Sequence, residues 1–182
     1  MKLKLKHFLS LLAVLLAGGL IGCSSTTKTA DVSGSVRKAL DQAGLKDVST
    51  SDDRDKGVVT LGGHVATDGE KAQAESIAAS QAVGQVVSNQ IAVIPPGAEH
   101  DAKAMNSDLD KGIEQNLDAA LIQDKLHDGV KYAVKNHVVT LTGNVDSQAA
   151  RARAQQVAAS VPNVQQVVNE LQIKNLKASS SN

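Results

Sequence analysis

The stretch Val58-Val59-Thr60-Leu61-Gly62-Gly63-His64-Val65 decides the fold, because it occurs twice. It returns 80 positions later as Val138-Val139-Thr140-Leu141-Thr142-Gly143-Asn144-Val145, and residues 57–94 align with 137–174 without a gap. Such a regular self-match indicates one small structural unit built twice. Units of roughly 65–75 residues bury only about 60% of their unfolded surface, so we expect the two copies to pack on each other.

Each copy of this stretch alternates as a strand does. In the first copy, Val59, Leu61 and Val65 fall on one face and Val58, Thr60 and His64 on the other. Gly63 shares the apolar face, where we expect a missing side chain to let a helix approach closely. We expect the sheet face with Val58 and Thr60 to stay uncovered. The same holds for the face with Val138, Thr140 and Thr142 in the second copy.

The flanking segments predict the other elements of each unit. Residues 32–43 and the segment after Ser107 carry apolar residues at helical spacing, although Gly112 disfavours a helix continuous from Asp108. Thr67 and Glu70 form a capping box that opens a further helix, and Ser147 opens its counterpart. Strands are expected around 48–53 and 130–135, and again over 87–94 and 167–174.

This order predicts an α+β fold of two tandem αββαβ units. The first two strands of a unit form an antiparallel hairpin, and the third returns after a helical crossover to lie parallel to its neighbour. Each unit is therefore expected to be a three-stranded mixed sheet with two helices on one face. The expected boundaries are a leader over 1–22, a tether over 23–30, units over 31–95 and 108–175, a polar linker over 96–107 and a disordered tail over 176–182.

The repeated motif resembles that of the BON domain family. The matching features are hydrophobic-Thr-Leu-x-Gly-x-Val in the second strand, an Ala-rich helix, and a last strand that carries Val87 and Asn89 or Val167 and Asn169. The usual Gly-Val pair before the last strand is Asn163-Val164 in the second unit and is reversed, as Val83-Gly84, in the first. The resemblance implies binding to phospholipid membranes, support of envelope integrity and no catalytic residues.

The first 22 residues read as a targeting segment. Three lysines precede an apolar run from Phe8 to about Leu20 that is too short to span a membrane. The run ends in Leu20-Ile21-Gly22-Cys23, which resembles the lipobox of bacterial lipoproteins and implies lipidation of Cys23. We therefore expect a membrane-anchored periplasmic protein, at the outer membrane if the source is Gram-negative, because Ser24 rather than Asp follows Cys23.

Charge and composition exclude several classes of function. Without residues 1–22 the chain has a net charge of −3, and aromatic residues make up 1% of the full sequence, so binding to nucleic acid is not expected. The locally basic part is the second unit, where Lys131, Lys135, Arg151 and Arg153 are candidate contacts for anionic lipid headgroups. Arg151 and Arg153 lie 200° apart on a helix, which weakens a shared patch.

No residue pattern predicts an enzyme. The histidines lack zinc-type spacing, no nucleophile motif is present, and the Gly62-Gly63 pair lacks the Lys-Ser/Thr of a phosphate-binding loop. We expect no cofactor and no metal site. Two functions stay open: a lipid-anchored module that binds phospholipid surfaces, and a periplasmic protein-interaction or chaperone-like stress module that uses envelope proteins as partners.

Overall fold

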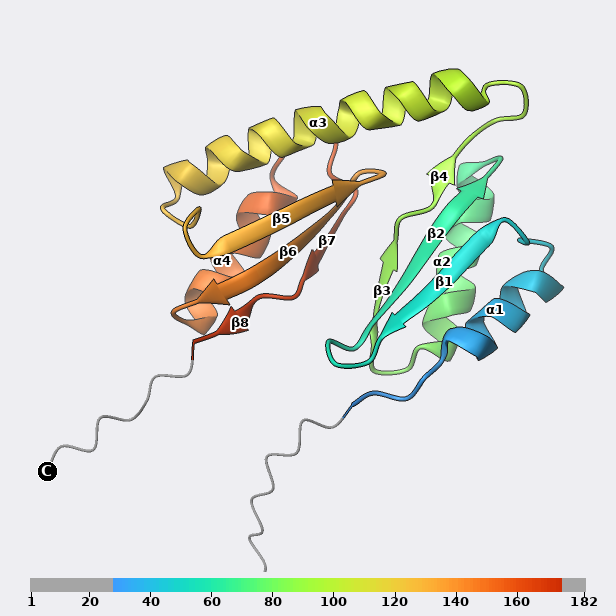
Figure 1. The fold of residues 1–182 in the computed structure, drawn as a ribbon, viewed down its shortest axis with the longest axis horizontal. Coiled ribbons are helices and arrows are strands. Elements are labelled where there is room, and N and C mark those ends of the chain that lie inside the picture. Colours follow the sequence, from blue (N-terminus) through green and yellow to red (C-terminus); the bar gives the residue numbers. More distant parts are fainter. Residues whose placement is uncertain (1–27, 175–182) are drawn as a thin grey trace, which may run out of the picture.

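The computed structural model describes residues 28–174, which form two units of the same design (Figure 1). The first unit contains α1 (Ser33–Gln42), β1 (Val48–Asp53), β2 (Val58–Val65), α2 (Asp68–Gln81), β3 (Val86–Asn89) and β4 (Ala92–Val93). The second contains α3 (Glu99–Gln123), β5 (Val130–Lys135), β6 (Val138–Val145), α4 (Gln148–Ala159), β7 (Gln166–Asn169) and β8 (Gln172–Ile173). The predicted α+β class and the repeated mixed sheet with helices are confirmed.

The sheet topology follows the predicted hairpin and crossover. β1 pairs antiparallel with β2, and both β3 and β4 pair parallel with β2 on its other side; β5 to β8 repeat this arrangement around β6. Each sheet has four strands rather than the three expected, because the last strand is interrupted. In the first unit the Asn89 side chain accepts a hydrogen bond from the amide of Ile91, and Asn169 accepts one from Leu171 at the equivalent place.

This repeated asparagine also joins the last strand to the crossover helix. The Asn89 carboxamide donates to the carbonyl of Lys71 and to the Glu75 carboxylate on α2. Asn169 donates in the same way to the Arg151 carbonyl and to Gln155 on α4. The asparagine of the motif is thus a structural residue that turns the strand and fixes its distance from the helix.

Each unit has its own apolar core between its helices and its sheet. The first is built from fully buried Val36, Leu40, Leu61, Ala74 and Ile91 with their neighbours. The second centres on buried residues of α3, α4 and the sheet, namely Ile113, Leu117, Leu121, Val139, Leu141, Ala154 and Leu171. Tyr132 packs against this second core, and burial together with its hydrogen bond to Asp118 raises the pKa of its hydroxyl.

The segment between the units is helical, where an irregular polar linker was expected. α3 begins at Glu99, not after Ser107, and continues through Gly112. Its first turns contain strong helix formers, and Glu99 and Asp101 place negative charge at its N-terminus, where the helix dipole favours it. In Figure 1 this long helix runs from the end of the first unit across to the second.

The reason for Gly63 also differs from the expected one. Gly63 has φ +87°, and a Cβ there would collide with the backbone carbonyl of Asp47, which precedes β1. Gly143 has φ +113°, and its Cβ would lie 2.5 Å from the carbonyl oxygen of Gly129. Glycine is therefore required because the backbone just before the first hairpin strand passes close by, and not because a helix approaches.

The expected tether ends within the first unit. Thr29 exchanges hydrogen bonds with Arg54 in the β1–β2 turn, and the Ala30 carbonyl accepts one from Gln85. The leader over 1–22, Cys23 and the tail over 176–182 lie outside the described residues.

Candidate functional site: the contact between the units and the basic side chains

The two units meet through the same positions of both copies. Val58 and Val138, which start β2 and β6, form one buried cluster with Val168 of β7. Ser88 of β3 stands at the position equivalent to Val168 and is 1% exposed. These side chains point to the sheet face opposite the helices, so each unit covers part of that face on the other. The expectation that Val58 and Val138 stay uncovered is therefore wrong, whereas Thr60, Thr140 and Thr142 remain half-buried.

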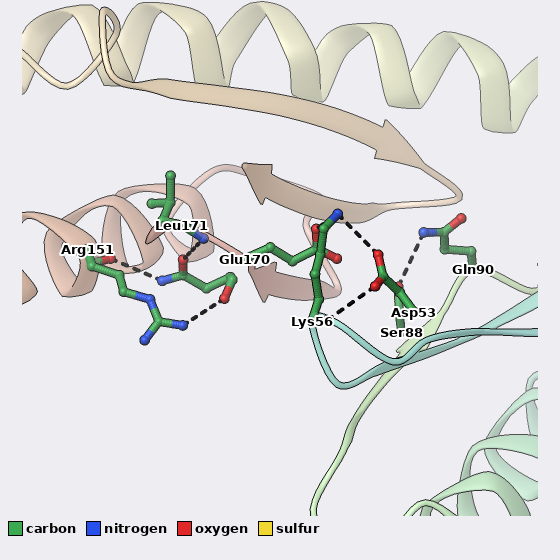
Figure 2. Close-up of polar contacts among 8 residues, drawn as sticks. Asp53, Lys56, Ser88, Gln90, Arg151, Glu170 and Leu171 are labelled. Carbon is green, nitrogen blue, oxygen red and sulfur yellow. Dashed lines mark hydrogen bonds and ion pairs between the residues drawn. The ribbon is translucent and has the colours of Figure 1, made fainter. Parts of the chain in front are cut away.

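Polar contacts surround this cluster, again at equivalent positions. The Lys56 ammonium lies 2.7 Å from the Glu170 carboxylate, with Asp53 at 3.4 Å on its other side (Figure 2). The residue equivalent to Lys56 is Asn136, which donates to the backbone carbonyl of Gln90, the position equivalent to Glu170. The hydrogen bond to Glu170 raises the pKa of Lys56.

The turn between β5 and β6 lies at this contact and is held by α3, the helix that joins the units. Asn136 and His137 have φ of 46° and 67°, as a tight hairpin turn requires. Both of their amides donate to the carboxylate of Asp110 on α3, each over 2.8 Å. The helix that joins the units thus also fixes the turn that touches the first unit.

Two glutamines complete the contact. Gln165 accepts a hydrogen bond from the Lys71 ammonium at 3.1 Å, and burial lowers the pKa of Lys71. Gln166 bonds to the free edge of β3, where its carboxamide accepts from the Asn89 amide and donates to the Val87 carbonyl.

The four candidate lipid contacts do not form one patch. Lys131 and Lys135 alternate with the core-facing residues of β5, so they project from the open face of the sheet and are exposed. Arg151 and Arg153 lie on α4, in the helix layer behind that sheet. Arg151 donates to the Asn169 carbonyl, and Arg153 is paired with Asp124 at 2.7 Å.

The described surface contains several shallow hollows. One of about 260 Å³ lies at the end of β2, where His64, Glu70 and Glu99 are among its lining residues. Glu70 is engaged in the capping box of α2, and Glu99 accepts from the Gly97 amide. Within residues 28–174, no group of three or more His, Cys, Asp or Glu side chains could hold a metal ion, and no helix is long and apolar enough to cross a membrane.

Sequence reasoning missed the residues that join the units. Lys56, Asp110, Gln166 and Glu170 act across the chain, and none of them belongs to a recognisable motif. The signal that could have found three of them is the difference between the copies, since the aligned pairs are Lys56 and Asn136, Val86 and Gln166, and Gln90 and Glu170.

Comparison with known proteins identifies the repeated unit. The family model of the BON domain matches residues 28–95 and again 109–175. Two solved structures of CdsD, a structural protein of the Type III secretion system of Chlamydia trachomatis, are similar at 13% identity, with TM-scores of 0.33 and 0.32. The matches cover 78% and 75% of this chain and 61% of each of those chains. No curated protein matches the chain.

Proposed function

Because the chain belongs to the BON domain family, we propose that it is a lipid-anchored envelope protein whose two BON modules bind phospholipid surfaces and support envelope integrity. BON domains are linked to membrane and phospholipid association. The lipobox-like segment ending in Cys23 supplies the anchor, since two or more lipid chains hold a protein stably at a membrane.

The observation that carries the lipid-binding part is the position of Lys131 and Lys135. Both are exposed on the open face of the second sheet, four residues apart on one strand, hence about 13 Å from each other. Neither forms an ion pair with another described residue. Each lysine near an anionic membrane surface contributes about 1 kcal/mol of binding free energy.

The test is vesicle flotation of residues 24–182, which contain every described helix and strand but no leader and no Cys23. We expect binding to vesicles that contain phosphatidylglycerol, weaker binding to pure phosphatidylcholine, and loss of the difference at high salt. Lys131→Glu with Lys135→Glu should reduce binding about tenfold or more.

A matched control makes the same charge change elsewhere. Lys38→Glu with Lys46→Glu alters two exposed lysines of the first unit and should leave binding nearly unchanged. If both double variants lose binding equally, net charge rather than the open sheet face governs it. If neither loses binding, the assignment to Lys131 and Lys135 is wrong.

The second candidate function is a periplasmic protein-interaction or chaperone-like module without direct lipid binding. The half-buried Thr140 and Thr142 leave part of the second sheet face free for a protein partner. Photocrosslinking from position 140 in cells separates the two functions: lipid adducts support the first, and a discrete protein adduct supports the second.

A further inference from the structure

Positions 86 and 166 are equivalent in the repeat, but the first is a valine and the second a glutamine. Gln166 starts β7 and Val86 starts β3, the edge strands that lie against each other where the units meet. Asn89, which Gln166 contacts, is 4% exposed, whereas its counterpart Asn169 is only partly buried. We call the β3 side of the contact complete, because the Gln166 side chain of the other unit bonds to it. We call the β7 side incomplete, because Val86 offers no equivalent polar side chain.

On the complete side, one carboxamide satisfies two backbone groups. The Gln166 nitrogen donates to the Val87 carbonyl at 2.6 Å, and its oxygen accepts from the Asn89 amide at 2.9 Å. Along a strand, the N–H and C=O of one residue point to one side and those of the next residue point to the other side. Residues 87 and 89 therefore direct these groups away from β2. Gln166 thus occupies the place that one residue of an added strand would take.

This geometry selects a primary carboxamide. Its NH₂ group has one N–H on the same side as the carbonyl oxygen, so donor and acceptor can address two neighbouring backbone groups together. A trans secondary amide directs its N–H away from its carbonyl, and an ionised carboxylate has no donor for a backbone carbonyl.

On the incomplete side the same backbone groups have no such partner. The Val167 carbonyl and the Asn169 amide are equivalent to those of Val87 and Asn89, and no described residue bonds to them. Val86 has no polar side chain to reach them, and it lines a hollow of about 300 Å³ beside β7 and α4.

Arg151 adds a polar wall to this hollow. Its Nη2 donates to the Asn169 carbonyl at 3.0 Å, and its Nε is buried without a described partner. Gln148 and Gln155 of α4 also line the space. Because β3 already lies against β7, the remaining opening suits one inserted side chain rather than a complete added strand.

We propose that this hollow binds the primary carboxamide of a glutamine or asparagine side chain from a protein partner, in the way that Gln166 binds β3. The carboxamide nitrogen donates to the Val167 carbonyl, and its oxygen accepts from the Asn169 amide. This recognition goes beyond the proposed lipid binding, because it is on a different part of the second unit from Lys131 and Lys135.

The test is an NMR titration of the isotope-labelled full chain with the peptide Gly-Gly-Gln-Gly-Gly, acetylated and closed as an N-methylamide so that its only primary amide is the glutamine. We expect a saturable shift of the Asn169 amide. Peptides with glutamate or N-methylated glutamine in the centre should require at least tenfold higher concentrations for the same shift.

Two variants locate the response. Val86→Gln supplies the carboxamide from within the chain, so it should shift and protect the Asn169 amide without peptide and weaken the peptide response at least tenfold. Val83→Gln makes the same change at a residue that is 86% exposed and does not line the hollow, and it should leave the response unchanged. The proposal is overturned by an absent shift, by an equal response to the glutamate peptide, or by a response that Val86→Gln does not alter.

Discussion

The ammonium group of Lys56 in the first unit lies 2.7 Å from the carboxylate of Glu170 in the second, across 114 positions of sequence. Glu170 is the less exposed partner, at 10%, so its charge depends on Lys56 for compensation. The repeat places Asn136 and Gln90 in the equivalent contact without charge. One of two equivalent links is therefore ionic and the other neutral.

Lys56→Met should destabilise the contact by about 1 kcal/mol, because the pair is partly solvated on the lysine side. Urea unfolding measures the loss, and Lys111→Met, which removes an exposed pair with Asp108 within α3, should cost less. Equal costs for the two variants would show that Lys56 does not stabilise the contact.

The same pair predicts a pH dependence. Glu170 raises the pKa of Lys56 above its ordinary 10.5, so the folded protein retains this proton more strongly than the unfolded chain. The stabilisation is fully present below 10.5 and is lost as pH rises through the raised pKa. The stability difference between wild type and Lys56→Met should therefore shrink at alkaline pH, and a constant difference would contradict this.

Val168→Asp should separate the units, because it places a charge in the cluster with Val58 and Val138. Each unit keeps its own core, so circular dichroism should retain the secondary structure while the radius of gyration from X-ray scattering increases. Thr140→Asp on the same sheet face is the control and should leave the radius of gyration unchanged. Unchanged scattering from Val168→Asp would refute the assigned contact.

Gly63→Ala should destabilise the first unit by about 1–3 kcal/mol, since a side chain there combines a left-handed backbone with a collision against the Asp47 carbonyl. Gly62→Ala is the neighbouring control, because its Cβ meets only the movable Ser49 hydroxyl at 2.9 Å. Thermal unfolding compares the two, and a larger loss for Gly62→Ala would contradict the assignment.

Asp110→Ala should cost about 1–3 kcal/mol, because it removes the acceptor for the amides of Asn136 and His137. Hydrogen exchange of these two amides should accelerate. Asp108→Ala, which removes an exposed carboxylate on the same helix, should leave their exchange unchanged.

Cys23→Ser should release the protein from the membrane fraction of a bacterial host, because it removes the sulfur that would carry the lipid. Mass spectrometry of the wild-type chain should show the added diacylglycerol. Ser24→Ala is the control and should stay in the membrane fraction. Retention of Cys23→Ser in the membrane would refute the proposed anchor.

The repeat made the fold predictable, because strand alternation, the capping box at Thr67 and the apolar helical spacing are all local signals. The interruption of the last strand was missed, since it depends on how the Asn89 side chain bonds to the backbone of Ile91. The start of α3 was misplaced because polar residues between units were interpreted as a linker, although glutamate, alanine and lysine favour a helix.

The candidate site was less predictable for a physical reason. Basic residues that are close in sequence, such as Arg151 and Arg153, project from different faces and find separate partners in Asn169 and Asp124. The residues that join the units, in contrast, are paired across long separations. Sequence spacing specifies the face of an element but not which surface of the other unit it meets.

Because both copies belong to one polypeptide, their contact requires less binding free energy than a contact between separate chains. Contact through the same positions of both copies is the pattern of a two-fold dimer. Here the connecting helix turns association into an intramolecular event, with an effective concentration that reaches about millimolar for short connections. A few valines, one ion pair and three amide side chains can then suffice. Cleavage between Pro96 and Glu99 would convert the same contact into an association that depends on dilution, and the two halves would part at low concentration.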